Sequence, residues 1–78
     1  MDRFESLRTL LAAVDGGSLS AASRALNTPL PTVSRRVSEL EAHLGAQLLV
    51  RTSRKLILTE AGEAFVKAAR RLLDDIRY

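Results

Sequence analysis

Apolar residues recur at steps of three and four through residues 1–15, which is the spacing of one face of an amphipathic helix. The positions on that face are Phe4, Leu7, Leu11 and Val14. Asp2 and Glu5 have the spacing of a capping box, and Gly16-Gly17 stops the pattern. We therefore expect a first helix over residues 2–15 that turns these four side chains to the core.

A second, short helix is predicted from Ser18, which is placed to cap it, to Leu26. Leu19, Ala22 and Leu26 form its inner stripe. The small side chains of Ala21 and Ala22 would let another helix cross closely at this stripe.

A third helix is predicted to begin near Leu30, because Pro29 and Pro31 are tolerated only in a turn or in the first turn of a helix. Gly45 ends it. Its buried face is marked by Val33, Val37, Leu40 and Leu44. Two helices joined by a short polar turn, the second longer and more basic, form the helix-turn-helix pattern.

The periodicity changes after the third helix. Two short apolar runs, residues 48–50 and 56–58, flank the polar stretch 51–55, which predicts a two-stranded hairpin with a basic tip. Thr59 is placed to cap a fourth helix, whose continuous apolar stripe is Phe65, Ala68, Ala69, Leu72, Leu73 and Ile76. The predicted fold class is mainly α, a winged helix-turn-helix with three helices, a two-stranded wing and a long C-terminal helix.

Composition narrows the class of protein. The 78 residues suffice for one small domain, and a hydrophobic fraction of 46% allows a compact core. The absence of cysteine excludes disulfides and thiolate metal sites. No apolar run is long enough to span a bilayer, and the start lacks the pattern of a signal peptide. We expect a soluble, cytoplasmic protein.

The charge is concentrated in one part of the chain. The formal net charge is +3, and residues 29–58 carry the whole of this excess. The charged residues of that stretch are the basic Arg35, Arg36, Arg51, Arg54 and Lys55 and the acidic Glu39 and Glu41. A basic balance placed in this way favours a polyanionic partner.

The third helix has a polar face that suits the major groove of DNA. On a helical projection Arg35 lies opposite the apolar positions, with Pro31 and Ser38 beside it. Thr32 and Ser34 flank this face. Arginine can pair bidentately with guanine, and serine and threonine can bond phosphates or bases. The alternative is a solvated polar face, but the place of this helix in a helix-turn-helix favours DNA.

The basic tip of the hairpin is the second candidate site. Arg51, Arg54 and Lys55 lie around Thr52, and a narrow minor groove or a phosphate attracts such side chains. The alternative is a solvent-exposed turn. Arg51, at a strand end, could instead pair with Glu41.

Two serines at the start of the second helix are further candidates, because the backbone N–H groups of a helix N-terminus attract phosphate. We expect Ser18 to cap the helix and Ser20 to contact phosphate, and both roles can hold at once.

The apolar stripe of the last helix has more positions than packing against the short first helix can bury. We expect Phe65 to pack on the first helix and the C-terminal half to meet a second copy of the chain. The predicted dimerisation residues are Phe65, Ala69, Leu72, Leu73 and Ile76. A two-fold dimer would present two recognition helices to an inverted repeat.

Catalysis finds little support in the sequence. His43 is the single histidine and is expected to be exposed near a helix end. Glu39 and Glu41 point to different faces of their helix and do not form an acid–base pair. The chain has no Gly-rich phosphate loop and no Ser/His/Asp set. We expect no enzyme, no metal and no cofactor.

Several short motifs follow one another over nearly the whole chain. They are Gly17–Ala22, Leu26, Pro31–Arg35, Leu40-Glu41, Leu44-Gly45, Leu48, Arg51-Thr52 and Leu58–Gly62. In this order and spacing they resemble the N-terminal domain of the LysR-type transcriptional regulators of bacteria. The match as a whole is far more specific than any one fragment.

The resemblance implies a winged helix whose third helix reads the major groove and whose wing reaches the neighbouring minor groove. The DNA contacts it implies are Leu30, Pro31, Thr32, Ser34 and Arg35 from the helix and Arg54 from the wing. It divides the chain into a DNA-binding domain, residues 1–58, and a truncated linker helix, residues 59–78, that pairs two subunits. It also implies an effector domain absent here, a tetrameric parent protein and no small molecule on this part.

One position departs from the family pattern. Where the family commonly has Ser-Gln-Pro, this chain has Pro29-Leu30-Pro31. Leu30 lacks the hydrogen bonds that glutamine makes to a base edge, but it can touch a thymine methyl group. A changed half-site preference is the resulting hypothesis. The loss of serine at Pro29 also removes the expected cap of the third helix.

Two alternatives stay open at this point. The apolar last helix could belong to a protein-interaction module with only non-specific affinity for DNA, its basic residues serving as solubilising charge. Another winged-helix family, such as the molybdate-responsive regulators, would have the same architecture and nearly the same DNA contacts.

Overall fold

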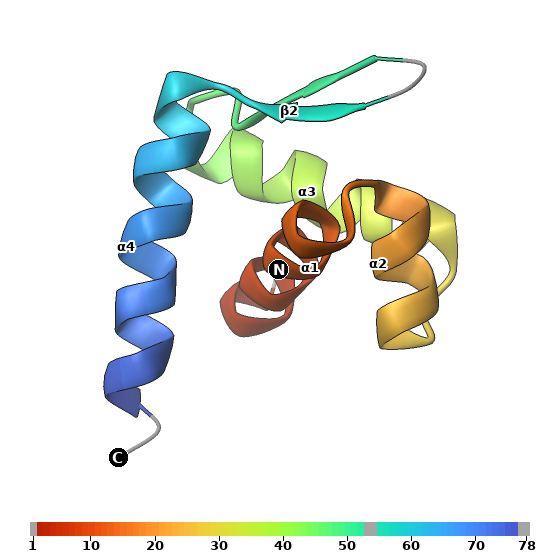
Figure 1. Ribbon diagram of the computed structural model, residues 1–78, viewed down its shortest axis with the longest axis horizontal. Helices are drawn as coiled ribbons and strands as arrows, with labels where there is room; N and C mark the ends of the chain where they lie inside the picture. Colours follow the sequence, from red (N-terminus) through yellow and green to blue (C-terminus); the bar gives the residue numbers. More distant parts are fainter. Residues whose placement is uncertain (1, 53–54, 77–78) are drawn as a thin grey trace.

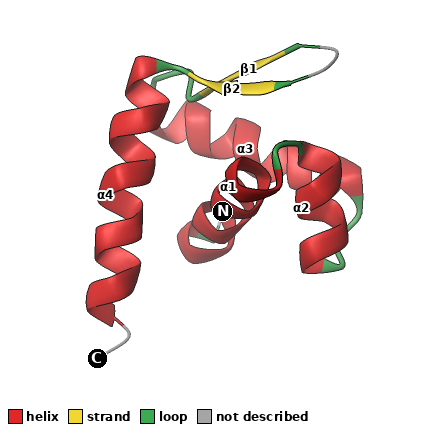
Figure 2. Cartoon of the chain, viewed as in Figure 1, coloured by secondary structure: helices red, strands yellow, loops and turns green. Residues whose placement is uncertain are grey.

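Four helices and one two-stranded sheet make up the computed structural model, which describes residues 2–52 and 55–76 (Figure 1). The elements are α1 (Arg3–Gly16), α2 (Leu19–Leu26), α3 (Leu30–Leu44), β1 (Leu49–Arg51), β2 (Leu56–Leu58) and α4 (Glu60–Ile76). The first three helices cross one another, the hairpin lies along one side of them, and α4 stands at the far edge (Figure 2). This is the mainly α, winged arrangement that the sequence predicts.

Side-chain caps begin α1 and α2 at the predicted residues, but the Glu5 carboxylate of the predicted capping box binds Arg8 and Arg36 instead of the Asp2 amide. The Asp2 carboxylate accepts hydrogen bonds from the amides of Phe4 at 3.0 Å and Glu5 at 3.2 Å. The Ser18 hydroxyl accepts one from the amide of Ala21 at 3.0 Å. These bonds satisfy amides that a helix start leaves without intrahelical partners, which places both boundaries.

Left-handed residues end the first three helices and turn the chain sharply. Gly17 after α1 has a φ of 84° and Gly45 after α3 has a φ of 66°. Asn27 after α2 also has a positive φ, 49°, a conformation that asparagine tolerates better than most residues. The short turn between α2 and α3 follows from this. Pro29, the N-cap residue of α3, makes no side-chain cap hydrogen bond, as expected.

The buried face of α1 differs from the predicted one. Phe4 is 55% exposed, and Leu7 and Val14 are half-buried. The buried residues of α1 are Ser6, Thr9, Leu10, Leu11 and Ala13. The predicted stripe is confirmed at Leu11, and Val14 packs against the core, but Phe4 is wrong and the buried Ser6, Thr9, Leu10 and Ala13 were missed. Three of these four are small or weakly polar residues, which suit the places where α2 and α3 cross α1. A pattern of large apolar residues does not mark those places.

The core has two clusters of buried residues. In the smaller one, α1, α2 and α3 meet through Ala13, Ala22 and Val33, which are fully buried. The main cluster has buried members from α1, α3, α4 and the start of the hairpin, and Leu19 of α2 packs against it. Its buried members are Leu10, Leu11, Val37, Leu40, Leu48, Leu49 and Val66. On α3, Val33, Val37 and Leu40 are buried as predicted, but Leu44, the last residue of the helix, is 40% exposed.

The first turn of α4 is hydrogen-bonded to the segment that begins the hairpin. The Thr59 hydroxyl accepts a hydrogen bond from the amide of Gly62 at 2.9 Å, which is the predicted cap, and donates one to the carbonyl of Gln47 at 2.6 Å. The Thr59 amide bonds the carbonyl of Leu48 at 2.9 Å. A Cβ on Gly62 would lie only 2.1 Å from that carbonyl oxygen, so glycine is required by the close approach of two backbones.

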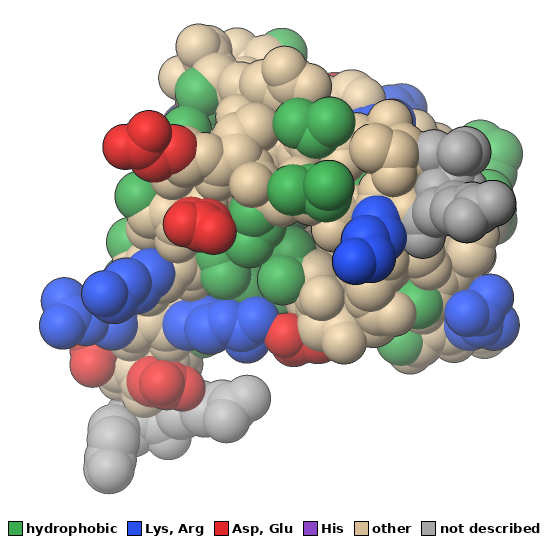
Figure 3. All heavy atoms as spheres, turned by 45° about the horizontal axis from the view of Figure 1, so that its top comes forward, with side chains coloured by type: hydrophobic (Ala, Val, Ile, Leu, Met, Phe, Trp, Pro, Cys, Tyr) green, Lys and Arg blue, Asp and Glu red, His purple; other side chains and the backbone are tan. Residues whose placement is uncertain are grey.

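Farther along, α4 leans on α1. Val66 and Ala69 are buried, while Phe65 and Leu73 are partly buried against the main cluster. The Arg70 guanidinium binds the Asp15 carboxylate at 2.5 Å, and this hydrogen bond raises the pKa of Arg70 above its ordinary value. Hydrophobic side chains show at the surface where α4 meets the helical body, with charged side chains over the lower part of α4 (Figure 3).

No helix within residues 2–52 and 55–76 is long and apolar enough to cross a membrane.

Candidate nucleic-acid interface

A hollow of about 320 Å³ opens between the starts of α2 and α3 and the hairpin. Its described lining is Gly17, Ser18, Leu19, Ser20, Leu30, Ser34, Arg51, Thr52, Lys55 and Leu56. Six of the predicted DNA-contact residues are among them: Ser18, Ser20, Leu30, Ser34, Arg51 and Thr52. Segments far apart in the sequence thus bring hydroxyls and cations to one concave place.

Ser18 and Ser20 bring the N-terminus of α2 to the hollow. The Ser18 oxygen is engaged in the cap, as expected, whereas Ser20 is exposed. The first amides of a helix and its dipole favour an anion at this end. This corner of the hollow is therefore suited to a phosphate.

The outward face of α3 is the one predicted. Arg35 and Pro31 are exposed, and Thr32 and Ser34 are half-buried at its edges. Arg35 does not line the hollow with the serines. It borders a separate depression together with Asp2, Glu5, Ser6, Arg36 and Glu39.

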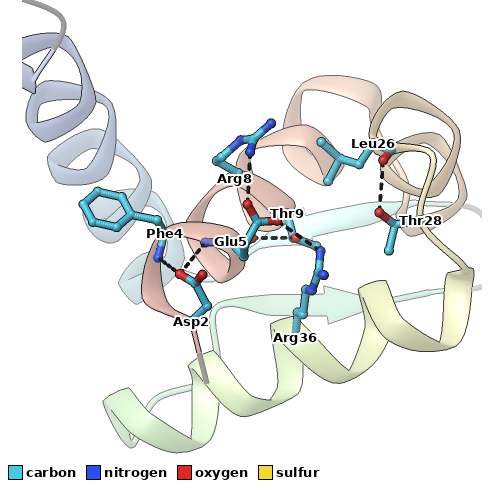
Figure 4. A network of polar contacts seen from close by, with 8 residues as sticks. All are labelled: Asp2, Phe4, Glu5, Arg8, Thr9, Leu26, Thr28 and Arg36. Atoms are coloured by element: carbon cyan, nitrogen blue, oxygen red, sulfur yellow. Dashed lines mark hydrogen bonds and ion pairs between the residues drawn. The ribbon is translucent and has the colours of Figure 1, made fainter.

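Arg36, the next residue, has a structural role instead. Its guanidinium binds the Glu5 carboxylate at 3.5 Å, and Glu5 also binds Arg8 at 3.0 Å (Figure 4). The Arg36 side chain is only 26% exposed. Of the two neighbouring arginines, Arg35 is the exposed one.

Arg51 links the hairpin to α3. It donates to the Ser34 hydroxyl at 3.1 Å and to the Ser38 hydroxyl at 3.4 Å. The alternative pairing with Glu41 is wrong, because the Glu41 carboxylate accepts hydrogen bonds from the amides at the start of the hairpin instead, at 2.7 Å from Leu48 and 3.2 Å from Leu49. Both contacts hold the hairpin at a set place on α3.

The hairpin is closed by Thr52, whose hydroxyl donates to the carbonyl of Lys55 and accepts from its amide, both at 2.9 Å. This polar closure brings Lys55 to the rim of the hollow. Arg54, the wing residue that the family resemblance implies, lies outside the described residues.

Two residues of this region were predicted to lie in the candidate sites but were not among the predicted DNA contacts. Lys55 lines the hollow, and Ser38 helps to hold Arg51. Both had a signal in the sequence, because Lys55 belongs to the basic hairpin tip and Ser38 follows Ser34 by four residues, which places the two hydroxyls on one helix face.

Few residues in the described ranges are candidates for catalysis or metal binding. His43 is exposed in the last turn of α3, as expected. Residues 2–52 and 55–76 contain no group of three or more His, Cys, Asp or Glu side chains that could hold a metal ion.

Replacing Arg51 with glutamine tests whether this residue positions the hairpin or contacts phosphate. A positioning role predicts weaker binding to a duplex with an unchanged slope of log affinity against log salt, because no counterion-releasing contact is lost. Lys55→Gln is the matched control, and each lost phosphate contact should make the slope about 0.9 shallower. Fluorescence anisotropy at several salt concentrations measures both variants. A shallower slope for Arg51→Gln would contradict the positioning role.

Comparisons with known proteins give consistent findings. A family model described as bacterial regulatory helix-turn-helix protein, lysR family, matches residues 4–63. An HTH-type transcriptional repressor of Pseudomonas aeruginosa is 45% identical over 76 residues, which are 97% of this chain and 24% of that protein. The HTH-type transcriptional regulator TfdS of Cupriavidus pinatubonensis is 44% identical over 71 residues, 91% of this chain and 24% of that protein. The chain spans about a quarter of the length of these curated relatives.

Solved structures resemble the whole arrangement. The BenM DNA-binding domain in complex with catB site 1 DNA superposes with a TM-score of 0.91 at 35% identity, covering 99% of this chain and 82% of that one. The full-length virulence activator AphB of Vibrio cholerae, a member of the LTTR family, has a TM-score of 0.88 at 38% identity, covering 99% of this chain and 26% of that one.

Proposed function

Because the chain belongs to the lysR family of bacterial regulatory helix-turn-helix proteins, we propose that it binds double-stranded DNA sequence-specifically, as a dimer, and regulates transcription. The observation that supports this most is the hollow in which Ser18, Ser20, Ser34 and Arg51 meet although they come from three separate elements. The DNA complex of the BenM domain, which has nearly the same fold, supports a duplex as the ligand.

In the proposed complex α3 enters the major groove with its exposed face. Arg35 reads a base edge, and the serines of α2 bind the phosphates beside the groove. The hairpin follows the backbone toward the adjacent minor groove. The proposed DNA contacts are Ser18, Ser20, Leu30, Pro31, Thr32, Ser34, Arg35, Arg51, Thr52 and Arg54, together with Lys55 of the basic hairpin tip.

Dimerisation through α4 is supported by the side chains that its own domain leaves uncovered. Leu72 is 51% and Ile76 is 55% exposed, and these are the two large hydrophobic side chains of the described part of α4 that lie open at the surface. Ala68, also in the predicted stripe, is exposed as well. Ala69 is buried against the domain, and Phe65 and Leu73 are partly buried. We therefore place the centre of the dimer contact on Leu72 and Ile76, with Phe65, Ala69 and Leu73 supporting the helix from behind.

The rest of the protein is inferred only from the relatives of this chain. Residues 59–78 are proposed to be the start of a linker helix, preceded by the DNA-binding domain of residues 1–58. An effector-sensing domain would follow in the parent protein, which is expected to act in the bacterial cytoplasm as a tetramer. The match to the lysR family favours this account over another winged-helix family such as the molybdate-responsive regulators.

Salt dependence separates DNA binding from the alternative of a protein-interaction module. For several phosphate contacts in each half-site, affinity for a fluorescent duplex should fall about a thousandfold between roughly 50 and 200 mM salt. An affinity that hardly changes would indicate hydrophobic association and contradict the proposal.

Competition in the same assay separates specific from non-specific binding. A duplex selected by the chain should outcompete its scrambled version by about a thousandfold or more. Equal competition would leave only non-specific affinity.

A further inference from the structure

The first turn of α3 is apolar where it faces the hollow. Leu30 lines the hollow next to the serines and is 43% exposed. Pro29 and Pro31 flank it in the sequence, and proline has neither an N–H group nor a polar side-chain atom. The side chains of these three residues therefore cannot hydrogen-bond a base edge.

Leu30 differs from the other exposed hydrophobic residues in its surroundings. The large hydrophobic side chains exposed elsewhere in the described ranges are Phe4, Leu44, Val50, Ile57, Leu72 and Ile76. None of these six lines the hollow. Leu44, on the same helix, is similarly exposed at 40% but lies at the opposite end.

A base edge offers an apolar side chain only one partner in the major groove, the C5 methyl group of thymine. We propose that Leu30 contacts this methyl group in each half-site and so makes the chain select a T·A pair at one fixed position. The inference rests on the proposed function, because it requires α3 to lie in the major groove.

The expected effect follows from the size of the contact. Removing one buried methyl group from an apolar contact costs about fourfold in affinity. When the methyl is removed from both half-sites of a dimer site, the loss should multiply to about fifteenfold. The Leu30 side chain has no polar group that a base other than thymine would leave unpaired. Another base is therefore disfavoured only by the loss of the contact with the methyl group.

Deoxyuridine substitution tests the inference, because it removes the thymine methyl and changes nothing else in the base pair. The probe is the inverted-repeat duplex that the chain selects from a random pool, with each thymine replaced in turn in both half-sites. The parent should lose about fifteenfold in affinity at one position. Leu30→Ala should bind the thymine and deoxyuridine forms of that position equally, whereas Leu44→Ala should behave as the parent.

A second variant, Leu30→Gln, tests how the base pair at this position is recognised. Leu30→Gln should abolish the methyl sensitivity at the same position, because glutamine recognises adenine through two hydrogen bonds and not through the thymine methyl group. The inference is overturned if the parent binds specifically but no thymine is methyl-sensitive, or if Leu30→Ala keeps the sensitivity. If the chain enriches no sequence, the proposed function fails and this inference fails with it. The two failures are therefore distinguished by whether the parent still binds a specific sequence.

Discussion

Replacing Arg35 with alanine is expected to weaken binding to the selected site by about 1–3 kcal/mol for each half-site, roughly five- to 150-fold, and to relax the base preference at one position. Arg35 is exposed on the face of α3 opposite the buried Val33, Val37 and Leu40. It is therefore free to pair with the two acceptors of guanine. Anisotropy titration of the selected duplex, and of variants at each base pair, measures both effects.

Two variants make this result specific. Arg35→Lys keeps the charge but loses the two-pronged geometry, so it should retain salt-dependent affinity and lose base preference. Arg36→Ala removes an equal charge one residue along, but that arginine binds Glu5 and is mostly buried. It should leave the base preference unchanged. If Arg35→Ala selects the same sequence with the affinity of the parent, α3 does not read DNA through this residue.

Replacing Gly62 with alanine is expected to destabilise the fold by about 3 kcal/mol, in spite of the higher helix propensity of alanine. The new Cβ would lie 2.1 Å from the carbonyl oxygen and 2.9 Å from the carbonyl carbon of Leu48. Both atoms belong to the backbone, so a side chain cannot move to relieve the clash. α4 would have to leave the hairpin, which disrupts the packing of Val66 and Ala69.

Thermal unfolding followed by circular dichroism measures this loss, and a fall in the midpoint of about 15 °C is expected for a domain of this size. Gly17→Ala is the matched control. A Cβ there meets no atom within 4 Å, but φ is +84°, so only backbone strain of about 1 kcal/mol is expected. Equal losses in the two variants would mean that the close approach of α4 to the hairpin is not what Gly62 provides.

Local signals in the sequence predicted the elements well. Caps at Asp2, Ser18 and Thr59 form as expected, and the glycines that end α1 and α3 adopt the left-handed conformation. Each of these features depends on a few neighbouring residues, which a single sequence contains in full. The order of the elements also followed from these signals, and the family resemblance added the expected roles of the third helix and the wing in DNA binding.

Tertiary relations were predicted less well, because they depend on which elements come together. The buried face of α1 is set by the crossing helices and includes Ser6 and Thr9, which a hydrophobic pattern does not select. Arg51 binds serines on α3 rather than Glu41, since that carboxylate is occupied by the hairpin amides. Val66, missed in the stripe of α4, is buried because the helix is seated at Gly62.

Selection of bound duplexes from a random DNA pool, read by sequencing at near-physiological salt, tests the central claim most directly. The account predicts enrichment of a short inverted repeat, with one half-site for each α3 of a dimer. Its half-site should contain a guanine read by Arg35 and a thymine at the position of Leu30. A pool that stays unenriched after repeated rounds would contradict the claim that this domain by itself recognises a DNA sequence.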